Sequence, residues 1–337
     1  MPASSCKTRD SQNWAAAVDP FLLQILTCPR DKFPLLEDGP ELVCPKGHAY
    51  PVVDGVPILL LSEMEQTHIE GQRSLAFGDR SKGEQPPRFE IEQGKVDPFV
   101  RNAIGATNGA LYQHLVGTLE GYPIPELNLP RGEGKTFLEI GCNWGRWCIA
   151  AARLGYTAAG VDPSLKSILA ARRVAKQLGV RAHYVVADGR TLPFGDAAFD
   201  QIFSYSVLQH LSRENVRVVL GEIRRVLDRE GGYQIQMPNA LGLRCIYHQF
   251  RRKFREAEGF EVRYWTPREL VSVFGGILGS ARMSVDGFFS LNAQISDLQF
   301  LPAKYRALVK VSHSLRKLSG VLPPLAYLAD SLYLSAP

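Results

Sequence analysis

The sequence predicts an α/β fold in which a doubly wound, mostly parallel sheet follows a small β-rich module and precedes a helical C-terminal extension. The first observation is that short apolar runs alternate with helical patterns between residues 136 and 237. Such alternation is typical of βαβ units, whose crossovers are almost always right-handed. The second observation is that residues 20–61 carry short apolar runs broken by Pro, Gly and Cys, which indicates separate small strands.

Each element of the α/β part has its own boundary signals. Apolar runs predict strands at 136–140, 157–161, 182–186, 199–204 and 233–237. Helical spacing predicts helices at 146–154, 164–178 and 212–227. Ser164 is the expected N-cap of the second helix, and Gly155, Gly179 and Gly231-Gly232 are expected to end the three helices. Further on, Thr266, Pro267 and Glu269 have the order of an N-cap, N1 and N3 of another helix.

The elements divide the chain into five expected segments. They are a leader at 1–19, the β-rich module at 20–61, a polar linker at 62–96, the α/β core with an N-terminal lid helix at 97–240, and a C-terminal extension at 241–337. The lid is inferred from its position just ahead of the core, and an ordinary surface helix is the alternative.

Composition places the chain among globular proteins, with 45% hydrophobic and 22% charged residues. The start lacks the apolar core of a signal peptide, and no apolar run reaches the length of about 18 residues that a transmembrane helix needs. Six cysteines scattered over a chain of 337 residues do not resemble a disulfide framework. We therefore expect a cytoplasmic protein.

Two basic clusters follow the core, at 244–255 and 304–317, in a chain of net charge +5. They indicate either solvated helix faces or contact with an anionic partner. An amphipathic pattern with a basic opposite face overlaps the second cluster. Its apolar positions are Leu308, Val311, Leu315 and Leu318. We expect this helix to dock on the domain, and peripheral contact with an anionic membrane surface is the alternative.

The turn after the first predicted strand of the core reads Glu139-x-Gly141-x-Asn143-x-Gly145. Its glycines allow positive φ angles and let a ligand approach the main chain. Asn143 stands where a third glycine is common, and Asn is the other residue that readily adopts the left-handed conformation. The turn lacks the Gly-x-Gly-x-x-Gly pattern that binds a diphosphate, and its acidic start favours a cationic ligand. A dinucleotide dehydrogenase is therefore the weaker interpretation.

Acidic residues also end the next two strands. Asp162 stands where a carboxylate accepts hydrogen bonds from the two hydroxyls of a ribose. Asp188-Gly189 follows the third strand, where a carboxylate can accept from the amino group of an adenine. Because the carboxyl ends of parallel strands meet at one edge of a sheet, these acids and the glycine turn are expected to lie together.

With these motifs, residues 135–240 resemble the class I S-adenosylmethionine-dependent methyltransferases. The matching segments read FLEIGCNWGR from 137, GVDP from 160, ADG from 187 and FDQIFSYSVLQH from 199. The resemblance implies a Rossmann-like sheet that binds S-adenosylmethionine, with the first turn at the amino-acid end and the two later acids at the ribose and the adenine. The cofactor-binding residues that it implies are Glu139, Gly141, Cys142, Asn143, Gly145, Asp162, Asp188, Gly189 and Ser204.

The N-terminal module contains two pairs of potential metal ligands. Cys28-x2-Asp31 and Cys44-x3-His48 have the spacing of a structural zinc site. Residues 22–61 resemble the small zinc-ribbon-like domain that accompanies or activates methyltransferases. Asp31 departs from the thiolate ligands of that domain, and a carboxylate is a poorer ligand in a structural site. Both a zinc site and a degenerate ribbon that folds without metal remain open.

Catalytic and substrate residues are less distinct in the sequence. His210, shortly after the fourth strand, is the candidate general base, and a hydrogen-bonded residue at a helix start is the alternative. The candidate substrate residues are Tyr112, Tyr205, Arg251 and Trp265.

These observations predict methyl transfer to a small molecule or to a glycan- or lipid-linked intermediate, which could be anionic. An RNA methyltransferase that grips phosphates with the ribbon module and basic patches is a second hypothesis. A partner protein that keeps the fold without the chemistry is a third. The acceptor itself is not encoded in the fold, because variable loops recognise it.

Overall fold

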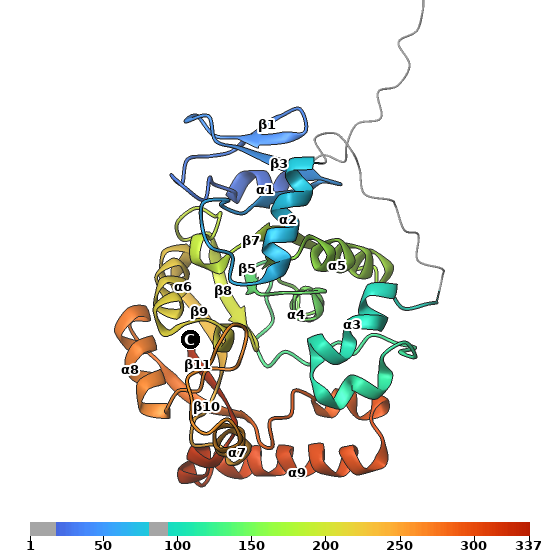
Figure 1. Ribbon diagram of the computed structural model, residues 1–337, viewed down its shortest axis with the longest axis vertical. Helices are drawn as coiled ribbons and strands as arrows, with labels where there is room; N and C mark the ends of the chain where they lie inside the picture. The colour runs from blue at the N-terminus through green and yellow to red at the C-terminus, as the bar shows by residue number, and fades with distance from the viewer. Residues whose placement is uncertain (1–17, 81–93) are drawn as a thin grey trace, which may run out of the picture.

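The computed structural model describes residues 18–80 and 94–337. Its strands are β1 Leu36–Asp38, β2 Glu41–Val43, β3 Ala49–Val53, β4 Val56–Leu59, β5 Thr136–Ile140, β6 Thr157–Asp162, β7 Ala182–Ala187, β8 Phe199–Ser204, β9 Leu227–Pro238, β10 Arg282–Gly287 and β11 Ser331–Ala336. Within the described residues these strands form one sheet in the order β1-β2-β3-β4-β7-β6-β5-β8-β9-β11-β10 (Figure 1).

The centre of this sheet is parallel. Strands β4, β7, β6, β5, β8 and β9 pair in parallel, so the carboxyl ends of β5 to β8 meet at one edge. The predicted doubly wound, mostly parallel sheet is confirmed. Strand β11 lies antiparallel between β9 and β10, and the sequence had not predicted these last two strands.

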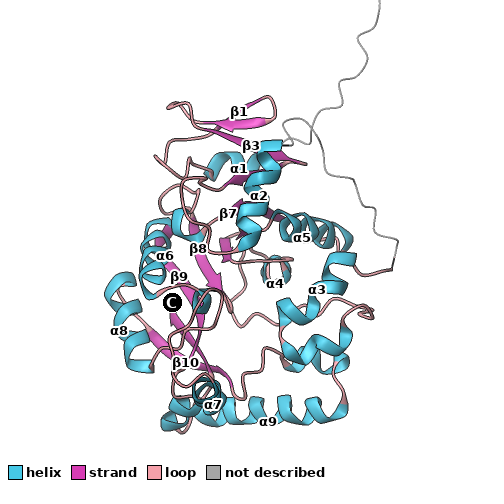
Figure 2. Cartoon of the chain, viewed as in Figure 1, coloured by secondary structure: helices cyan, strands magenta, loops and turns pink. Residues whose placement is uncertain are grey.

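Helices cover both faces of the sheet (Figure 2). They are α1 Pro20–Ile25, α2 Ile69–Arg80, α3 Pro98–Asn108, α4 Arg146–Arg153, α5 Leu165–Gln177, α6 Arg213–Val226, α7 Leu243–Arg251, α8 Pro267–Leu278 and α9 Ala303–Ser319. Helices α3, α4 and α5 pack into one buried cluster, and α6 and α8 pack into the other. Neighbouring strand residues alternate between the two clusters, as Phe137 and Leu138 do, because successive side chains of a strand point to opposite faces.

Side-chain caps fix where three of these helices begin. The hydroxyls of Ser164 and Ser212 accept from the third residue of α5 and α6, and Thr266 forms a capping box with Glu269 at the start of α8. The predicted end of α6 at Gly231-Gly232 was wrong. Helix α6 ends at Val226, and both glycines lie inside β9, where a Cβ would collide with neighbouring backbone carbonyls.

The N-terminal module continues the central sheet. Strand β4 pairs with β7 through Ile58 opposite Val186 and Leu59 opposite Ala187. The Thr27 N–H also donates to the Pro193 carbonyl at 2.9 Å. The module and the α/β core therefore share hydrogen-bonded strands.

The segment expected to be a polar linker at 62–96 contains helix α2. Ser74 of this helix is buried, and its hydroxyl lies 2.7 Å from the Pro163 carbonyl and accepts from the Leu165 N–H at 2.9 Å. Helix α2 is thus fastened to the turn between β6 and α5, and a linker was the wrong expectation for 69–80. The remaining linker positions 81–93, like leader positions 1–17, lie outside the described residues, while Asp19 is the N-cap of α1.

The C-terminal extension holds the expected amphipathic helix as α9, and Leu308 and Leu315 of the predicted stripe pack against the buried clusters. Val309 and Ser312 are its buried residues, whereas Val311 and Leu318 are exposed. The Ser312 hydroxyl accepts from the Phe288 N–H at 3.0 Å and so helps to fix the inward side of α9 against the strand region. Among the described residues, no helix has both the length and the apolar character needed to cross a membrane.

Candidate functional site

The turn between β5 and α4 has the strained backbone that its sequence implies. Gly141 and Gly145 have φ angles of 78° and 79°, and Asn143 has a φ of 47°. A Cβ at Gly141 would collide with Val207, and a Cβ at Gly145 would collide with Tyr184, so both glycines also permit close packing. The left-handed conformation expected of Asn143 is confirmed.

Glu139, the last residue but one of β5, connects β5 to helix α4 on the far side of this turn. Its carboxylate is buried and accepts from the Cys148 N–H at 2.9 Å and from the Cys148 thiol at 3.0 Å. Burial raises the pKa of Glu139 to about 8. The structure therefore explains Glu139 through its bonds to α4, and its contact with the amino-acid end of a cofactor stays a prediction. Cys142 is likewise buried beneath the turn, where it packs against Gly160.

Asp162 joins the first two turns of the sheet. Its carboxylate accepts from the Asn143 N–H at 3.0 Å and from the Ser164 N–H at 2.9 Å. Burial raises the pKa of Asp162 to about 6, although both hydrogen bonds favour the ionised form. The turn after β5 and the acid after β6 are thus in direct contact, as the parallel-strand argument predicted.

Asp188, at the end of β7, already has a strong partner. Arg190 donates to its two carboxylate oxygens at 3.0 and 2.8 Å, and both side chains are largely buried. Gly189 follows in a short 3-10 turn that begins at Asp188. An adenine amino group would share the Asp188 carboxylate with Arg190, which the sequence had not indicated.

At the end of β8, buried polar bonds connect β8 with β5, β10 and β11. Ser204 donates to the Ile140 carbonyl at 2.9 Å and so ties β8 to β5. The next residue, Tyr205, donates to Asp286 of β10 at 2.9 Å, and the Ser331 hydroxyl of β11 donates to the same oxygen at 2.7 Å. Burial raises the pKa of Asp286 despite these two donors. Sequence reasoning missed Asp286, because no pattern marked β10 as part of the sheet.

Tyr112 lies in a second polar corner, in the 3-10 helix η1 Ala110–Leu115 that follows α3. Its hydroxyl is buried and has no hydrogen-bond partner among the described residues, and the same is true of Asn108 Nδ2 and Asp297 Oδ1. Burial raises the pKa of Tyr112 far above its usual range, and the Asp297 carboxylate adds to the shift. The Asp297 carboxylate and the Arg146 guanidinium both act on the Tyr112 hydroxyl, which places these three side chains together in one buried corner.

Arg146, the first residue of α4, lies against two aromatic rings. Its guanidinium carbon lies 5.3 Å from the centroid of the Trp147 ring and 5.8 Å from that of Tyr205. It is buried, and no carboxylate of the described chain forms an ion pair with it. A buried cation without a carboxylate partner is costly, so it is a natural anchor for an anionic group. The sequence contained Arg146 in the glycine-turn motif but gave no reason to single it out.

His210 is engaged in packing. Its Nδ1–H donates to the Phe260 carbonyl at 2.7 Å, and its ring stacks on the Phe260 ring at 3.9 Å between centroids. Nε2 lies 3.2 Å from the Gln209 amide nitrogen, and burial lowers the pKa of the imidazole. These contacts fit the alternative interpretation, a hydrogen-bonded residue at a helix start, and a role as general base stays a prediction.

The four predicted substrate residues do not form one group. Tyr112 and Tyr205 belong to the same buried cluster, together with Trp147. Trp265 is buried in the other cluster, where Arg213 covers its ring at 4.2 Å. Arg251 is exposed at the end of α7. The distance between them follows from the sheet, since the two clusters lie on opposite faces.

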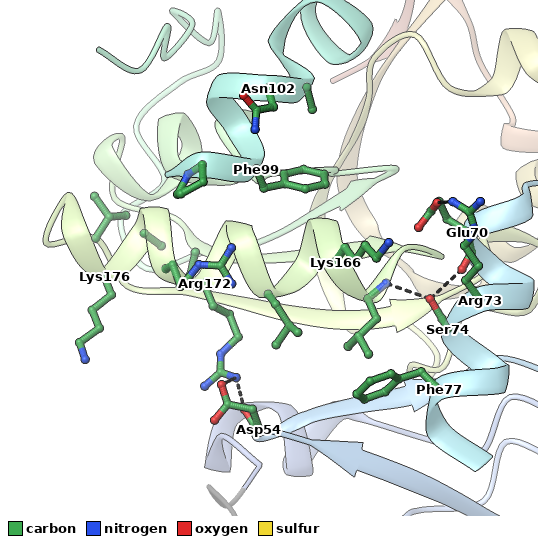
Figure 3. A pocket seen from close by; sticks show the side chains of 18 of the residues that line it. Asp54, Glu70, Arg73, Ser74, Phe77, Phe99, Asn102, Lys166, Arg172 and Lys176 are labelled. Atoms are coloured by element: carbon green, nitrogen blue, oxygen red, sulfur yellow. Dashed lines mark hydrogen bonds and ion pairs between the residues drawn. The ribbon is translucent and has the colours of Figure 1, made fainter. Parts of the chain in front are cut away.

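A cavity of about 1370 Å³ opens between α2, α3 and the outer side of α5 (Figure 3). Phe99 of α3 and Phe77 of α2 lie on opposite sides of α5 in this view, and Lys166 and Lys176 lie along α5. The cavity approaches the edge of the sheet where Leu165 begins α5, but the predicted cofactor residues are absent from its walls. We therefore regard it as a neighbour of the candidate site.

The four predicted metal ligands converge in the N-terminal module. The ligand atoms of Cys28, Asp31, Cys44 and His48 all lie within 4.8 Å of one another. His48 Nδ1 lies 3.5 Å from the Cys28 sulfur, 3.4 Å from the Cys44 sulfur and 3.0 Å from an Asp31 oxygen. In tetrahedral zinc with ordinary bond lengths, sulfur and nitrogen ligands are about 3.5 Å apart. The donor set therefore fits a zinc ion.

Two family comparisons agree with this geometry. Residues 137–231 match a family described as methyltransferase domain, and residues 19–55 match the Trm112p-like proteins. The N-terminal part is 48% identical over 50 residues to a UPF0434 protein of Vesicomyosocius okutanii, covering 14% of this chain and 85% of that protein.

The core resembles the curated relatives over only part of their length. It is 36% identical over 86 residues to a ubiquinone biosynthesis O-methyltransferase of Brucella ovis, which covers 25% of this chain and 35% of the relative. The chain thus spans about a third of the length of that relative. A solved methyltransferase structure from Archaeoglobus fulgidus is similar at 17% identity and a TM-score of 0.41, covering 61% of this chain and 87% of the other.

Proposed function

We infer from two matched regions that this chain transfers a methyl group from S-adenosylmethionine. Residues 19–55 make the chain a member of the Trm112p-like family, and a methyltransferase domain follows at 137–231. The acceptor in this proposal is a small molecule or a glycan- or lipid-linked intermediate. The O-methyltransferase relative supports a hydroxyl oxygen as the methylated atom.

The contact between Asp162 and the glycine turn carries the cofactor part of the proposal. A carboxylate at the end of β6 that also touches the Asn143 N–H is suited to hold ribose hydroxyls beside the turn. The turn Gly141-x-Asn143-x-Gly145 lacks the Gly-x-Gly-x-x-Gly pattern that binds a diphosphate, which favours S-adenosylmethionine over a dinucleotide. S-adenosylmethionine supplies an activated methyl group, and the residues of this chain bind and orient it.

The polar corners beyond β8 support the acceptor part. Arg146 would stabilise the oxyanion form of an acceptor hydroxyl, which is the form that attacks a methyl group. Tyr112 and Tyr205 would fix the ring or head group of the acceptor in line with the carbon–sulfur bond. In this arrangement the buried cation lowers the pKa of the acceptor hydroxyl, whose proton passes to solvent water, and the oxyanion attacks the methyl carbon as S-adenosylhomocysteine leaves.

Cofactor binding and label transfer test this proposal. Calorimetric titration of the full chain with S-adenosylmethionine is expected to show binding that Asp162→Ala weakens by about tenfold or more, the usual loss for a charged hydrogen-bonding partner. Glu214→Ala, at an exposed acid of α6, is the matched control and should bind normally. No affinity for S-adenosylmethionine, or affinity untouched by Asp162→Ala, would favour the non-catalytic partner protein.

The acceptor class is tested by incubating the chain with methyl-labelled cofactor and three fractions. We expect label in a small-molecule or lipid extract. Label that enters RNA instead, with affinity that falls steeply as salt rises, would favour the RNA methyltransferase. Arg146→Gln should abolish label transfer in the productive fraction, whereas Arg146→Lys should restore part of it.

A further inference from the structure

Helix α7 presents its apolar side to solvent. Leu243, Ile246, Tyr247 and Phe250 are 52%, 43%, 52% and 69% exposed. Their spacing of i, i+3, i+4 and i+7 places them on one face of the helix. The side that meets the protein is narrower and is marked by Cys245, which is buried. An amphipathic helix docked with its apolar face outward is unusual for a protein surface and indicates a binding surface.

A second apolar stretch adjoins α7. The 3-10 helix η5 Pro323–Leu328 and the residues just before it expose Val321, Leu322, Tyr327 and Leu328. Asp330, two residues beyond η5, accepts from the Arg244 N–H at 2.7 Å and from the Cys245 N–H at 3.0 Å. These bonds fix η5 beside the N-terminus of α7, at the end of the molecule opposite the N-terminal module (Figure 1). We call the exposed residues of α7 and η5 the α7–η5 face.

Cations line this face. Arg244 and Arg251 lie at i and i+7 along α7, next to the apolar stripe, and the helix contains no acidic residue. His248 lies between them, and burial together with the two arginines lowers the pKa of its imidazole. Within 18–80 and 94–337, no carboxylate forms an ion pair with Arg244, Arg251 or Lys253. The nearby Glu261 forms its ion pairs with Arg252 and Arg255 instead. The positive charge beside the apolar stripe is therefore not neutralised by the protein.

The charges and apolar groups of the α7–η5 face indicate which kind of partner can bind it. A second copy of this chain would bring Arg244 and Arg251 near their own counterparts, and like charges repel. A surface of anionic phospholipid supplies both complements, since its acyl chains accept Leu243 and Phe250 and its head groups neutralise the arginines. A helix with a large apolar face and basic flanks lies in the plane of such an interface.

We propose that the α7–η5 face binds the surface of anionic lipid bilayers, with α7 lying in the interface plane. In this orientation α7 enters the boundary between head groups and acyl chains, and Tyr247 lies at head-group level. The interaction is reversible and needs neither cofactor nor acceptor. It is independent of the proposed methyl transfer, although it would bring the protein to a lipid-linked acceptor.

Vesicle sedimentation of the full chain tests the proposal. We expect binding to phosphatidylcholine vesicles that contain phosphatidylglycerol, weak binding to pure phosphatidylcholine, and loss of binding as salt rises. Phe250→Ser should weaken partitioning roughly tenfold, because it removes a large apolar side chain from the interface. Arg251→Glu should weaken it at least tenfold on anionic vesicles alone, because it replaces an attracted charge with a repelled one.

Two exposed residues of α6 provide matched controls. Val218→Ser and Arg217→Glu change the same kinds of side chain on another helix and should leave vesicle binding unchanged. Absence of binding to anionic vesicles would overturn the proposal, as would a loss equally large in the controls. A concentration-dependent dimer that Phe250→Ser dissociates, without affinity for vesicles, would assign the face to a protein contact and overturn it too. Normal cofactor binding by Phe250→Ser would separate either result from the proposed methyl transfer.

Discussion

Asp162 combines two roles that depend on its charge. Its carboxylate holds the Asn143 and Ser164 N–H groups, and burial raises its pKa to about 6. If ribose hydroxyls bind the ionised form, cofactor affinity must fall as pH drops below that value, because the proton competes with the ligand. We expect the Kd of the wild-type chain for S-adenosylmethionine to be roughly tenfold higher at pH 5 than at pH 7. Calorimetry at the two pH values measures this ratio.

Asp162→Asn is the control for that titration. An amide has no charge to lose, so the variant should bind weakly and with the same Kd at pH 5 and pH 7. The pH range stays below about 8, where Glu139 begins to ionise and would add its own effect. Equal wild-type affinity at pH 5 and pH 7 would contradict the assignment of Asp162 to the cofactor.

Asn143 tests the backbone of the turn. Its φ of 47° lies in the left-handed region, and its side-chain oxygen accepts from the Trp144 N–H at 2.9 Å. Asn143→Gly should keep the free energy of unfolding close to wild type, because glycine adopts this conformation without strain. Asn143→Val should lower it by about 1–2 kcal/mol, the usual cost of a branched residue there. Urea unfolding of both variants measures the difference, and equal stability would contradict the strain argument.

At this scale the sequence indicated the residues that lie at strand ends and little else. Asp162 could be predicted because the end of an apolar run fixes its position at the sheet edge. Arg146 and Asp286 could not, because their importance depends on what surrounds them. Arg146 matters through the Trp147 and Tyr205 rings that surround it, and Asp286 through the hydroxyls of residues 205 and 331 that donate to it. His210 was singled out for its chemistry, and only the structure reveals that Phe260 engages both its ring and its Nδ1–H.

Among the helices and strands, those with local sequence signals could be predicted, whereas those that depend on tertiary contacts could not. The helix at Thr266 was predictable because its capping box is written in four consecutive residues. Strand β11 was not, because it inserts between β9 and β10 and its neighbours are far away in sequence. Helix α2 was mistaken for linker because its composition is polar. Its attachment rests on a few contacts, namely the hydrogen bonds of Ser74 and the packing of Leu75 and Phe77 against the core.

The zinc ribbon is the element whose chemistry is most open to measurement. Four donor atoms within 4.8 Å of one another predict about one equivalent of zinc in the purified chain. Cys44→Ser should abolish it, because it removes one of the two thiolates. Cys245→Ser, at a buried thiol of α7, is the matched control and should retain the metal. Metal analysis measures both, and zinc well below one equivalent in the wild type, unchanged by Cys44→Ser, would leave the degenerate ribbon as the interpretation.

For the molecule as a whole, the pairing of β4 with β7 makes one folding unit of two sequence families. Residues 19–55 and 137–231 match separate families, and on that basis they are expected to unfold separately. The strand pairs Ile58–Val186 and Leu59–Ala187 argue otherwise, since the hydrogen-bonded sheet runs through both. Leu42 of β2 is buried in the same cluster as Ile202 and Leu220 of the core, so apolar packing is also shared.

Leu42→Ala distinguishes the two behaviours. Tryptophans 144, 147 and 265 all lie in the α/β part, so their emission in a Trp14→Phe background reports the unfolding of that part alone. A buried leucine reduced to alanine should lower the free energy of unfolding by about 2–5 kcal/mol. If the sheet unfolds as one unit, the urea midpoint of tryptophan emission must fall together with that of far-UV circular dichroism. A tryptophan midpoint unchanged by Leu42→Ala would mean that the ribbon unfolds separately from the core. The shared sheet would then not couple the stability of the N-terminal module to that of the candidate site.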